Sequence, residues 1–148
     1  MATQRALSIE DRNLESSTLV TARDRVYRDL DLSFEARPSG DLYIKKDAAA
    51  VKQAIKTLIL TNRFERPFQP NLGADLSQLL FELNNTDIAQ DIKEQIKAAI
   101  QTYEPRAEVL GIQTTPLVDT NEVQVTIVFN LVNTEEQVTL TVNVSRLR

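Results

Sequence analysis

Residues 122–132 read EVQVTIVFNLV, a stretch in which apolar and polar residues alternate almost without a break. Successive side chains of a β-strand point to opposite faces, so this alternation predicts a strand with one face on a core. Residues 138–144 alternate in the same way after a short polar segment, and the two stretches together predict a hairpin. The predicted inward residues of the first stretch are Val123, Val125, Ile127, Phe129 and Leu131.

A third extended stretch, residues 107–118, precedes the hairpin, so the end of the chain predicts a three-stranded antiparallel meander. All the helical patterns lie before it, at residues 47–61, 74–82 and 86–102. Helices and strands are therefore segregated rather than alternating. This order predicts an α+β fold with about three helices and one C-terminal antiparallel sheet in a single domain.

The helix predictions depend on apolar residues spaced three and four apart. Such a stripe follows Asp47, which we expect to be the N-cap of the first helix, and another precedes Pro105. In the first helix the stripe is Val51, Ala54, Ile55, Leu58 and Ile59. In the last helix it is Ile88, Ile92, Ile96, Ala99, Ile100 and Tyr103.

The N-terminal part of the chain is less regular. Residues 31–35 alternate polar and apolar and predict a short strand, and the turn residues RPSGD follow at 37–41. Residues 1–27 mix both charge signs with few large apolar residues, and we interpret them as an arm. Either they lack fixed structure or they order on a partner, and the sequence does not choose. The domain is then expected to span residues 28–148.

The composition excludes much familiar chemistry. The chain has no histidine and no cysteine, so it lacks the usual zinc ligands, the commonest general base and any thiolate nucleophile. We therefore expect no catalytic residue, metal site or cofactor. A net charge of −4 disfavours nucleic acid and anionic membrane as partners. No apolar run approaches the roughly 18 residues of a membrane span and no signal peptide is apparent, so we expect the chain in the cytoplasm at first.

Two segments place glutamate and arginine around a proline beside a helical pattern. The first elbow, residues 62–73, reads NRFERPFQPNLG, and the second elbow, residues 103–109, reads YEPRAEV. Proline ends a helix because the preceding residue is forced out of the helical conformation. The simplest interpretation of the charged residues is ion pairing that braces the junctions, which contributes about 0–1 kcal/mol when exposed.

A catalytic interpretation would make Glu65 and Glu104 the acid and base of a lysozyme-like glycan hydrolase. That chemistry requires the two carboxyl groups to lie about 5–9.5 Å apart across a sugar cleft. Sugar clefts commonly stack aromatic rings on their substrates, whereas aromatic residues make up 5% of this chain and tryptophan is absent. A non-enzymatic role, as a part of a larger assembly, is therefore preferred, and the hydrolase is kept as the alternative.

The end of the chain lacks the residues that usually protect strand edges. No lysine or arginine occurs between Arg106 and Arg146, and residues 122–145 contain no proline. Thr139, Thr141 and Asn143 form the polar side of the last strand. Soluble proteins commonly protect a free edge with lysine, proline or a bulge. The last strand is therefore either covered by its own fold or available to a strand of another chain.

Several motifs occur in a fixed order between about residues 29 and 144. They are DLDLSF at 29–34, the helix from Asp47, FERPFQPNLG at 64–73, LLFE at 79–82 and YEPRAEV at 103–109. In this order they closely resemble the small baseplate wedge proteins of contractile-tailed phages. The same family includes lysozyme-like wedge proteins and the sheath-initiating baseplate component of type VI secretion.

The resemblance implies a non-enzymatic part of a contractile tail. Such a protein lies in the baseplate wedge around the tail tube and presents strands that the first ring of sheath subunits extends. The implied partners are other wedge proteins and the tail sheath protein, with the tail tube as a further candidate. The implied location is the tail baseplate of the virion, after assembly in the host cytoplasm. The partner-binding residues expected on these grounds are Glu104, Pro105, Arg106, Glu65, Arg66, Thr139, Thr141 and Asn143.

The chain departs from the family pattern in the first elbow. The family usually has glycine before its Glu-Arg pair, and this chain has Phe64. The substitution suggests a differently packed elbow. Residues 1–27 lie outside the resemblance, so no partner for them follows from it.

Overall fold

The computed structural model describes residues 26–80, 88–117, 122–134 and 136–145. Its main sheet has the strand order β3-β4-β5 and consists of β3 (Ala107–Leu117), β4 (Glu122–Leu131) and β5 (Gln137–Ser145). All pairs are antiparallel; Glu122 lies opposite Ser145, and Ala107 opposite Leu131. The meander predicted from the alternating sequence is therefore present.

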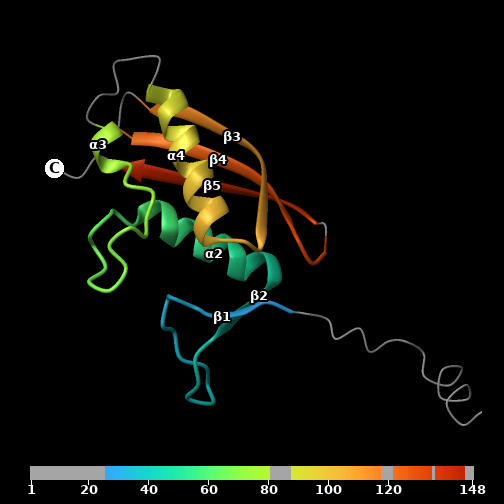
Figure 1. Ribbon diagram of the computed structural model, residues 1–148. Helices are drawn as coiled ribbons and strands as arrows, with labels where there is room; N and C mark the ends of the chain where they lie inside the picture. Colours follow the sequence, from blue (N-terminus) through green and yellow to red (C-terminus); the bar gives the residue numbers. More distant parts are fainter. Residues whose placement is uncertain (1–25, 81–87, 118–121, 135, 146–148) are drawn as a thin grey trace, which may run out of the picture.

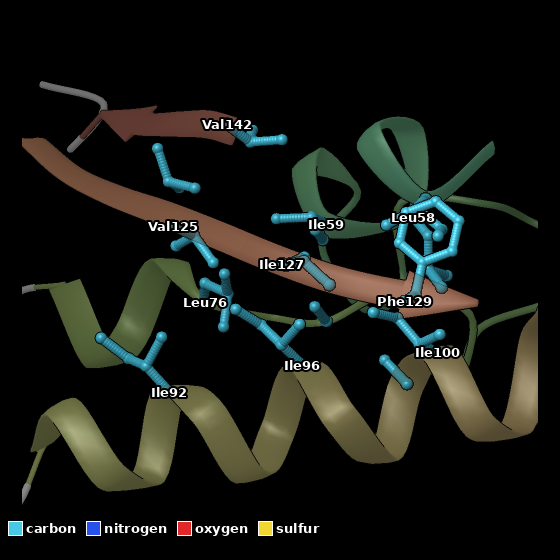
Figure 2. Packing of buried hydrophobic residues seen from close by; sticks show 14 of the residues in the cluster. Leu58, Ile59, Leu76, Ile92, Ile96, Ile100, Val125, Ile127, Phe129 and Val142 are labelled. Carbon is cyan, nitrogen blue, oxygen red and sulfur yellow. The ribbon is translucent and has the colours of Figure 1, made fainter. Parts of the chain in front are cut away.

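Two long helices cover one face of this sheet (Figure 1). They are α2 (Asp47–Leu60), which contacts β5, and α4 (Ile88–Tyr103), which contacts β3. Their apolar stripes meet the inward residues of β4, and Figure 2 shows Ile96 and Ile100 directed toward Ile127 and Phe129. No helix in the described ranges is long and apolar enough to cross a membrane.

The alternating pattern of β4 is reproduced in its burial. Val125, Ile127 and Phe129 are fully buried, while the residues between them are partly exposed on the other face of the sheet. A one-residue shift in register would move this whole set to the solvent face, so the core specifies the register. Hydrophobic burial therefore holds the sheet in place.

The predicted inventory of three helices and one sheet is wrong in two respects. In the described residues the middle helix, predicted at 74–82, is the single turn α3 (Ser77–Leu80). A second sheet of two short strands, β1 (Arg28–Leu30) and β2 (Ile44–Lys46), lies beside α2 (Figure 1). The α+β class itself agrees with the structure. Residues 81–87, which include the predicted start of the last helix, are outside the described part.

The strand predicted at residues 31–35 is absent for a local reason. The Asp31 carboxylate accepts a hydrogen bond from the backbone N–H of Ser33 at 3.0 Å, and the Asp31 carbonyl accepts one from Phe34 at 3.3 Å. These bonds close a turn, which competes with an extended chain. The Ser33 N–H and the ammonium of Lys45, 3.0 Å away, lower the pKa of Asp31. The strand pairing falls just before the turn, at Arg28–Leu30.

Asp47 does not act as the predicted N-cap of α2. The N-cap is Lys46, which makes no capping bond with its side chain, and Asp47 is the first helical residue. Its carboxylate instead accepts the backbone N–H of Tyr27 at 3.1 Å, and its own N–H donates to the Tyr27 carbonyl at 2.9 Å. Asp47 therefore ties the chain before β1 to the start of the helix.

Replacing Phe129 with alanine should destabilise the protein by about 3–5 kcal/mol, because a fully buried ring leaves a cavity among packed side chains. Urea unfolding followed by circular dichroism measures the loss. Val128→Ala, on the opposite face of the same strand, is the matched control and should cost less than about 1 kcal/mol. Equal losses would contradict the assignment of the core to one face of β4.

Candidate interaction site

The second elbow joins α4 to β3 and buries a carboxylate at the junction. Glu104 follows the last residue of α4, its backbone N–H still bonds to the Ile100 carbonyl at 2.8 Å, and the residue is 5% exposed. Pro105 then prevents the helix from continuing, and β3 begins at Ala107. A buried carboxylate in this position requires a partner, because an unpaired buried charge is strongly unfavourable.

Arg106 supplies that partner through two hydrogen bonds. Its Nε donates to Oε1 of Glu104 at 2.6 Å and its Nη2 donates to Oε2 at 2.7 Å. This planar arrangement matches a guanidinium to a carboxylate and is stronger than a single contact. The hydrogen bonds that Arg106 donates to Glu104 raise the pKa of Arg106 above its ordinary value against the opposing effect of burial, so the side chain stays charged.

The same arginine holds the N-terminal part of the described chain. Its Nη1 donates to Asp29 of β1 at 3.1 Å, and its guanidinium carbon lies 5.4 Å from the centre of the Tyr27 ring. A cation near the face of an aromatic ring is attracted to it. The cluster of Arg106, Glu104, Asp29 and Tyr27, here called the Arg106 cluster, therefore joins β1, α4 and β3.

Tyr27 and Asp29 were not predicted as site residues. Asp29 lies 77 residues from Arg106 in the sequence. A local pattern cannot indicate a contact over that separation. The only signal was their position in or beside the DLDLSF motif, which carried the family resemblance without indicating a role.

The first elbow is a closed loop with its own hydrogen bonds. The Phe64 N–H donates to the Pro70 carbonyl at 2.8 Å, and Glu65 accepts the backbone N–H of Asn62 at 2.9 Å. The loop is also tied to the second elbow, because the Tyr103 hydroxyl donates to the Asn71 carbonyl at 2.7 Å. Glu65 thus braces the loop and is not paired with Arg66.

Two residues of this loop have left-handed backbone conformations. Gly73 has φ +127°, and a Cβ there would collide with the Thr61 carbonyl oxygen, so glycine is required. Phe64 has φ +63°, which costs a residue with a side chain roughly 1–2 kcal/mol. The residue before the Glu-Arg pair thus has a left-handed backbone although it is phenylalanine, and Phe64 is 79% exposed.

The two elbows border one groove of about 410 Å³ beside α2. Arg66 of the first elbow and Glu104 of the second both line it, together with Asp29 and Tyr103. The structure therefore brings together the two charged segments that the sequence singled out. Thr139, Thr141 and Asn143 lie elsewhere, exposed on the face of β5 that is turned away from the helices.

The two glutamates of the hydrolase interpretation are each hydrogen-bonded within the chain. Both oxygens of Glu104 accept N–H bonds from Arg106, and Glu65 accepts the backbone N–H of Asn62. Within the described residues, no group of three or more histidine, cysteine, aspartate or glutamate side chains could hold a metal ion. The bonds that the cluster makes within the chain brace the junction of β1, α4 and β3.

These features define a small α+β domain whose charged residues join and orient its elements. A family model described as baseplate wedge protein gp25 matches residues 45–136, which is more than half of the chain. The chain belongs to this family of baseplate wedge proteins, which are structural parts of contractile tails. The resemblance inferred from the ordered motifs is confirmed.

Similar proteins agree with this assignment. The chain is 27% identical over 115 residues to baseplate wedge protein gp25 of Enterobacteria phage T4, covering 78% of this chain and 87% of the phage protein. A Geobacter sulfurreducens protein provisionally described as a tail lysozyme has a similar structure, with TM-score 0.60 and 22% identity over 66% of this chain and 89% of that one. A chain of the anti-feeding prophage baseplate matches with TM-score 0.58 and 15% identity, covering 83% and 88%. The two structures establish the fold alone.

Arg106→Ala should lower the free energy of unfolding by about 3 kcal/mol, because it leaves the buried Glu104 carboxylate without its partner. Chemical unfolding in urea measures the change. Arg63→Ala is the control, since Arg63 is exposed and makes no ion pair with a described residue, and it should cost less than about 0.5 kcal/mol. If Arg106→Ala were as stable as the control, the bracing role would be wrong.

Proposed function

We propose that this wedge protein joins the baseplate wedge to the tail sheath and starts sheath assembly by accepting a strand at the outer edge of β5. Membership of the wedge family supports the location in the baseplate. The observation that carries the proposal is the difference between the two outer edges of the main sheet. Strand addition to an exposed edge is a recurring way in which one chain binds another.

The edge strand β3 carries two features that hinder pairing. Its register with β4 shifts between Val109 and Gly111, which marks a bulge, and Pro116 removes one backbone donor. Bulges and prolines are among the features by which proteins protect free edges. β3 is therefore the poorer acceptor.

The other edge strand, β5, has neither feature. Residues 137–145 contain no proline, lysine or arginine, and the pairing with β4 continues from Asn130–Gln137 to Glu122–Ser145 without a shift. Among the described strands only β4 pairs with β5. Its outer edge thus offers a regular row of backbone donors and acceptors, which favours β5 as the acceptor.

The exposed polar residues of β5 suit this role without providing its main affinity. Thr141 lies 3.4 Å from Thr126 between hydroxyl oxygens, and Asn143 accepts a bond from Gln124 at 3.4 Å. Both contacts tie β5 to its own neighbour. Backbone bonds supply the affinity in strand addition, whereas Thr139, Thr141 and Asn143 contribute to register.

We further propose that the elbows face other wedge proteins. Three of the five guanidinium N–H groups of Arg106 are used within the chain, which leaves two for a partner. Pro105, Glu65 and Arg66 are exposed, whereas buried Glu104 acts by orienting Arg106. Assembly of these contacts would take place in the host cytoplasm, with the tail tube as a further neighbour.

Proline on β5 should block sheath assembly where its missing N–H would have bonded to the incoming strand. Along β5, backbone amides that face the incoming strand alternate with amides that face β4. Leu140→Pro and Thr141→Pro therefore place a proline once at each kind of position. Electron microscopy monitors sheath polymerisation on purified baseplates. Polymerisation should fail for the variant whose proline replaces an amide that faces the incoming strand. Circular dichroism identifies the variant that still folds.

Thr141→Val is the control, because it keeps the backbone donor and changes only the exposed side chain; it should leave polymerisation near normal. Thr141→Lys adds the charge that commonly protects edges and should slow polymerisation in a folded protein. Strand pairing at β5 would be refuted if two folded variants both polymerised sheath at the normal rate. These are the proline variant that lacks an amide facing the incoming strand and Thr141→Lys.

The purified protein should release no reducing sugar from peptidoglycan, because Glu65 and Glu104 are hydrogen-bonded within the chain as bracing residues. A turbidity assay on cell walls compares the wild type with the double variant Glu65→Gln, Glu104→Gln. Hydrolysis by the wild type that disappears in the double variant would establish the lysozyme-like alternative in place of the purely structural role.

A further inference from the structure

The first elbow, residues 62–73, presents two phenylalanine residues that are hardly buried by the described part of the chain. Phe68 is 98% exposed and Phe64 is 79% exposed. Single exposed apolar residues are common and need no explanation. Here, however, two large rings occur on the same short loop, which runs outward from the body between α2 and α3 (Figure 1).

The loop holds these rings in a defined conformation. Its two ends are joined by the bond from the Phe64 N–H to the Pro70 carbonyl, and Pro67 and Pro70 restrict the backbone between them. The Asn62–Glu65 and Tyr103–Asn71 bonds fix its base to the domain. A loop that is ordered before binding loses little entropy on binding, which is favourable for an anchor.

The conformation of Phe64 is itself unfavourable for a phenylalanine. The backbone is left-handed, where glycine would be relaxed, and the exposed ring provides almost no burial within the chain to offset this. Strained residues of this kind cluster at functional sites such as ligand clamps and switch regions. A partner that buries the ring would account for phenylalanine at this position.

The charges beside the rings indicate the partner's chemistry. Arg63 and Arg66 are exposed and form no ion pair with a described residue, whereas the only carboxylate of the loop, Glu65, is bonded to the Asn62 N–H. The loop therefore presents apolar rings flanked by unpaired positive charge. An apolar pocket with carboxylates on its rim is the complementary surface.

We propose that the first elbow inserts Phe64 and Phe68 into an apolar, acid-rimmed pocket of a neighbouring wedge protein. Aromatic residues with adjacent arginines are the residues that most often dominate binding at interfaces. The proposal rests on the proposed contact between the elbows and other wedge proteins and is independent of strand pairing at β5.

The test measures binding of the full-length protein to a subassembly of the other wedge proteins of the same particle, with no sheath protein present. Phe68→Ala should weaken binding about thirtyfold, which corresponds to about 2 kcal/mol, and Phe64→Gly should weaken it about tenfold or more. Phe64→Gly should also melt at the same or a higher temperature, because glycine relieves the left-handed backbone. Loss of affinity without loss of stability is the expected signature.

Phe34→Gly is a closely matched control. Phe34 is also 66% exposed and has φ +54°, but it lies in the turn before β2 and outside the first elbow. Its replacement should leave binding unchanged. An equal loss in Phe34→Gly and Phe64→Gly would attribute the effect to the backbone rather than the ring and would overturn the proposal.

The charge prediction is tested in the same assay. Arg63→Gln with Arg66→Gln should slow association and reduce its dependence on salt, since rim charges act mainly on the association rate. Binding of Phe68→Ala and Phe64→Gly with wild-type affinity would refute the anchor, and binding by the wild type that is insensitive to salt would refute the acidic rim. The folded β5 proline variant should bind the wedge normally, so failure of strand pairing is distinguishable from failure of this interface.

Discussion

The ion pair between Glu104 and Arg106 is the constraint on which the arrangement of the other elements depends. Pro105 ends α4 and sets the direction of β3, while the two side chains on either side of it meet in a double hydrogen bond. Because Glu104 is buried, Arg106 cannot turn away without leaving a charge in the interior. Arg106 is therefore held in the orientation in which it also reaches Asp29 and Tyr27.

This arrangement changes how the Glu-Pro-Arg motif is interpreted. From sequence, ion pairing within the chain and contact with a partner were alternatives, and in the structure one residue has capacity for both. Arg106 is anchored by the carboxylate, and its remaining donors then have a fixed direction, which lowers the entropy lost on binding. A partner that contacts Arg106 would also bind close to β1, since Asp29 shares the same guanidinium.

The parts of the fold that could be predicted are those determined by burial. The alternation around Ile127 and the helical stripe through Ile96 both follow from placing apolar side chains on one core, and both predictions agree with the structure. The second sheet was missed because it depends on contacts that no local pattern contains. The pairing of β1 with β2 joins two three-residue strands, and β1 is also held by Arg106 from a distant segment. At Asp31, a side-chain turn prevailed over a weak alternation. For the candidate site, the charged elbows were identified from sequence, but Tyr103 was not recognised as the link between them.

An unprotected edge raises the question of why two copies of this chain would not pair through it. The described part of the sheet contains acidic but no basic residues, and Glu122 and Glu136 lie at opposite ends of the β4–β5 hairpin. In an antiparallel self-pairing, two β5 edges would bring these negative charges of both copies toward one another. Charges within about 8–10 Å still interact at physiological salt, so carboxylates brought this close would disfavour self-pairing, whereas a neutral or basic strand would not meet this repulsion. If β5 accepts a strand as proposed, the absence of lysine leaves its backbone open to pairing, and the acidic residues would favour a neutral or basic strand from a different chain.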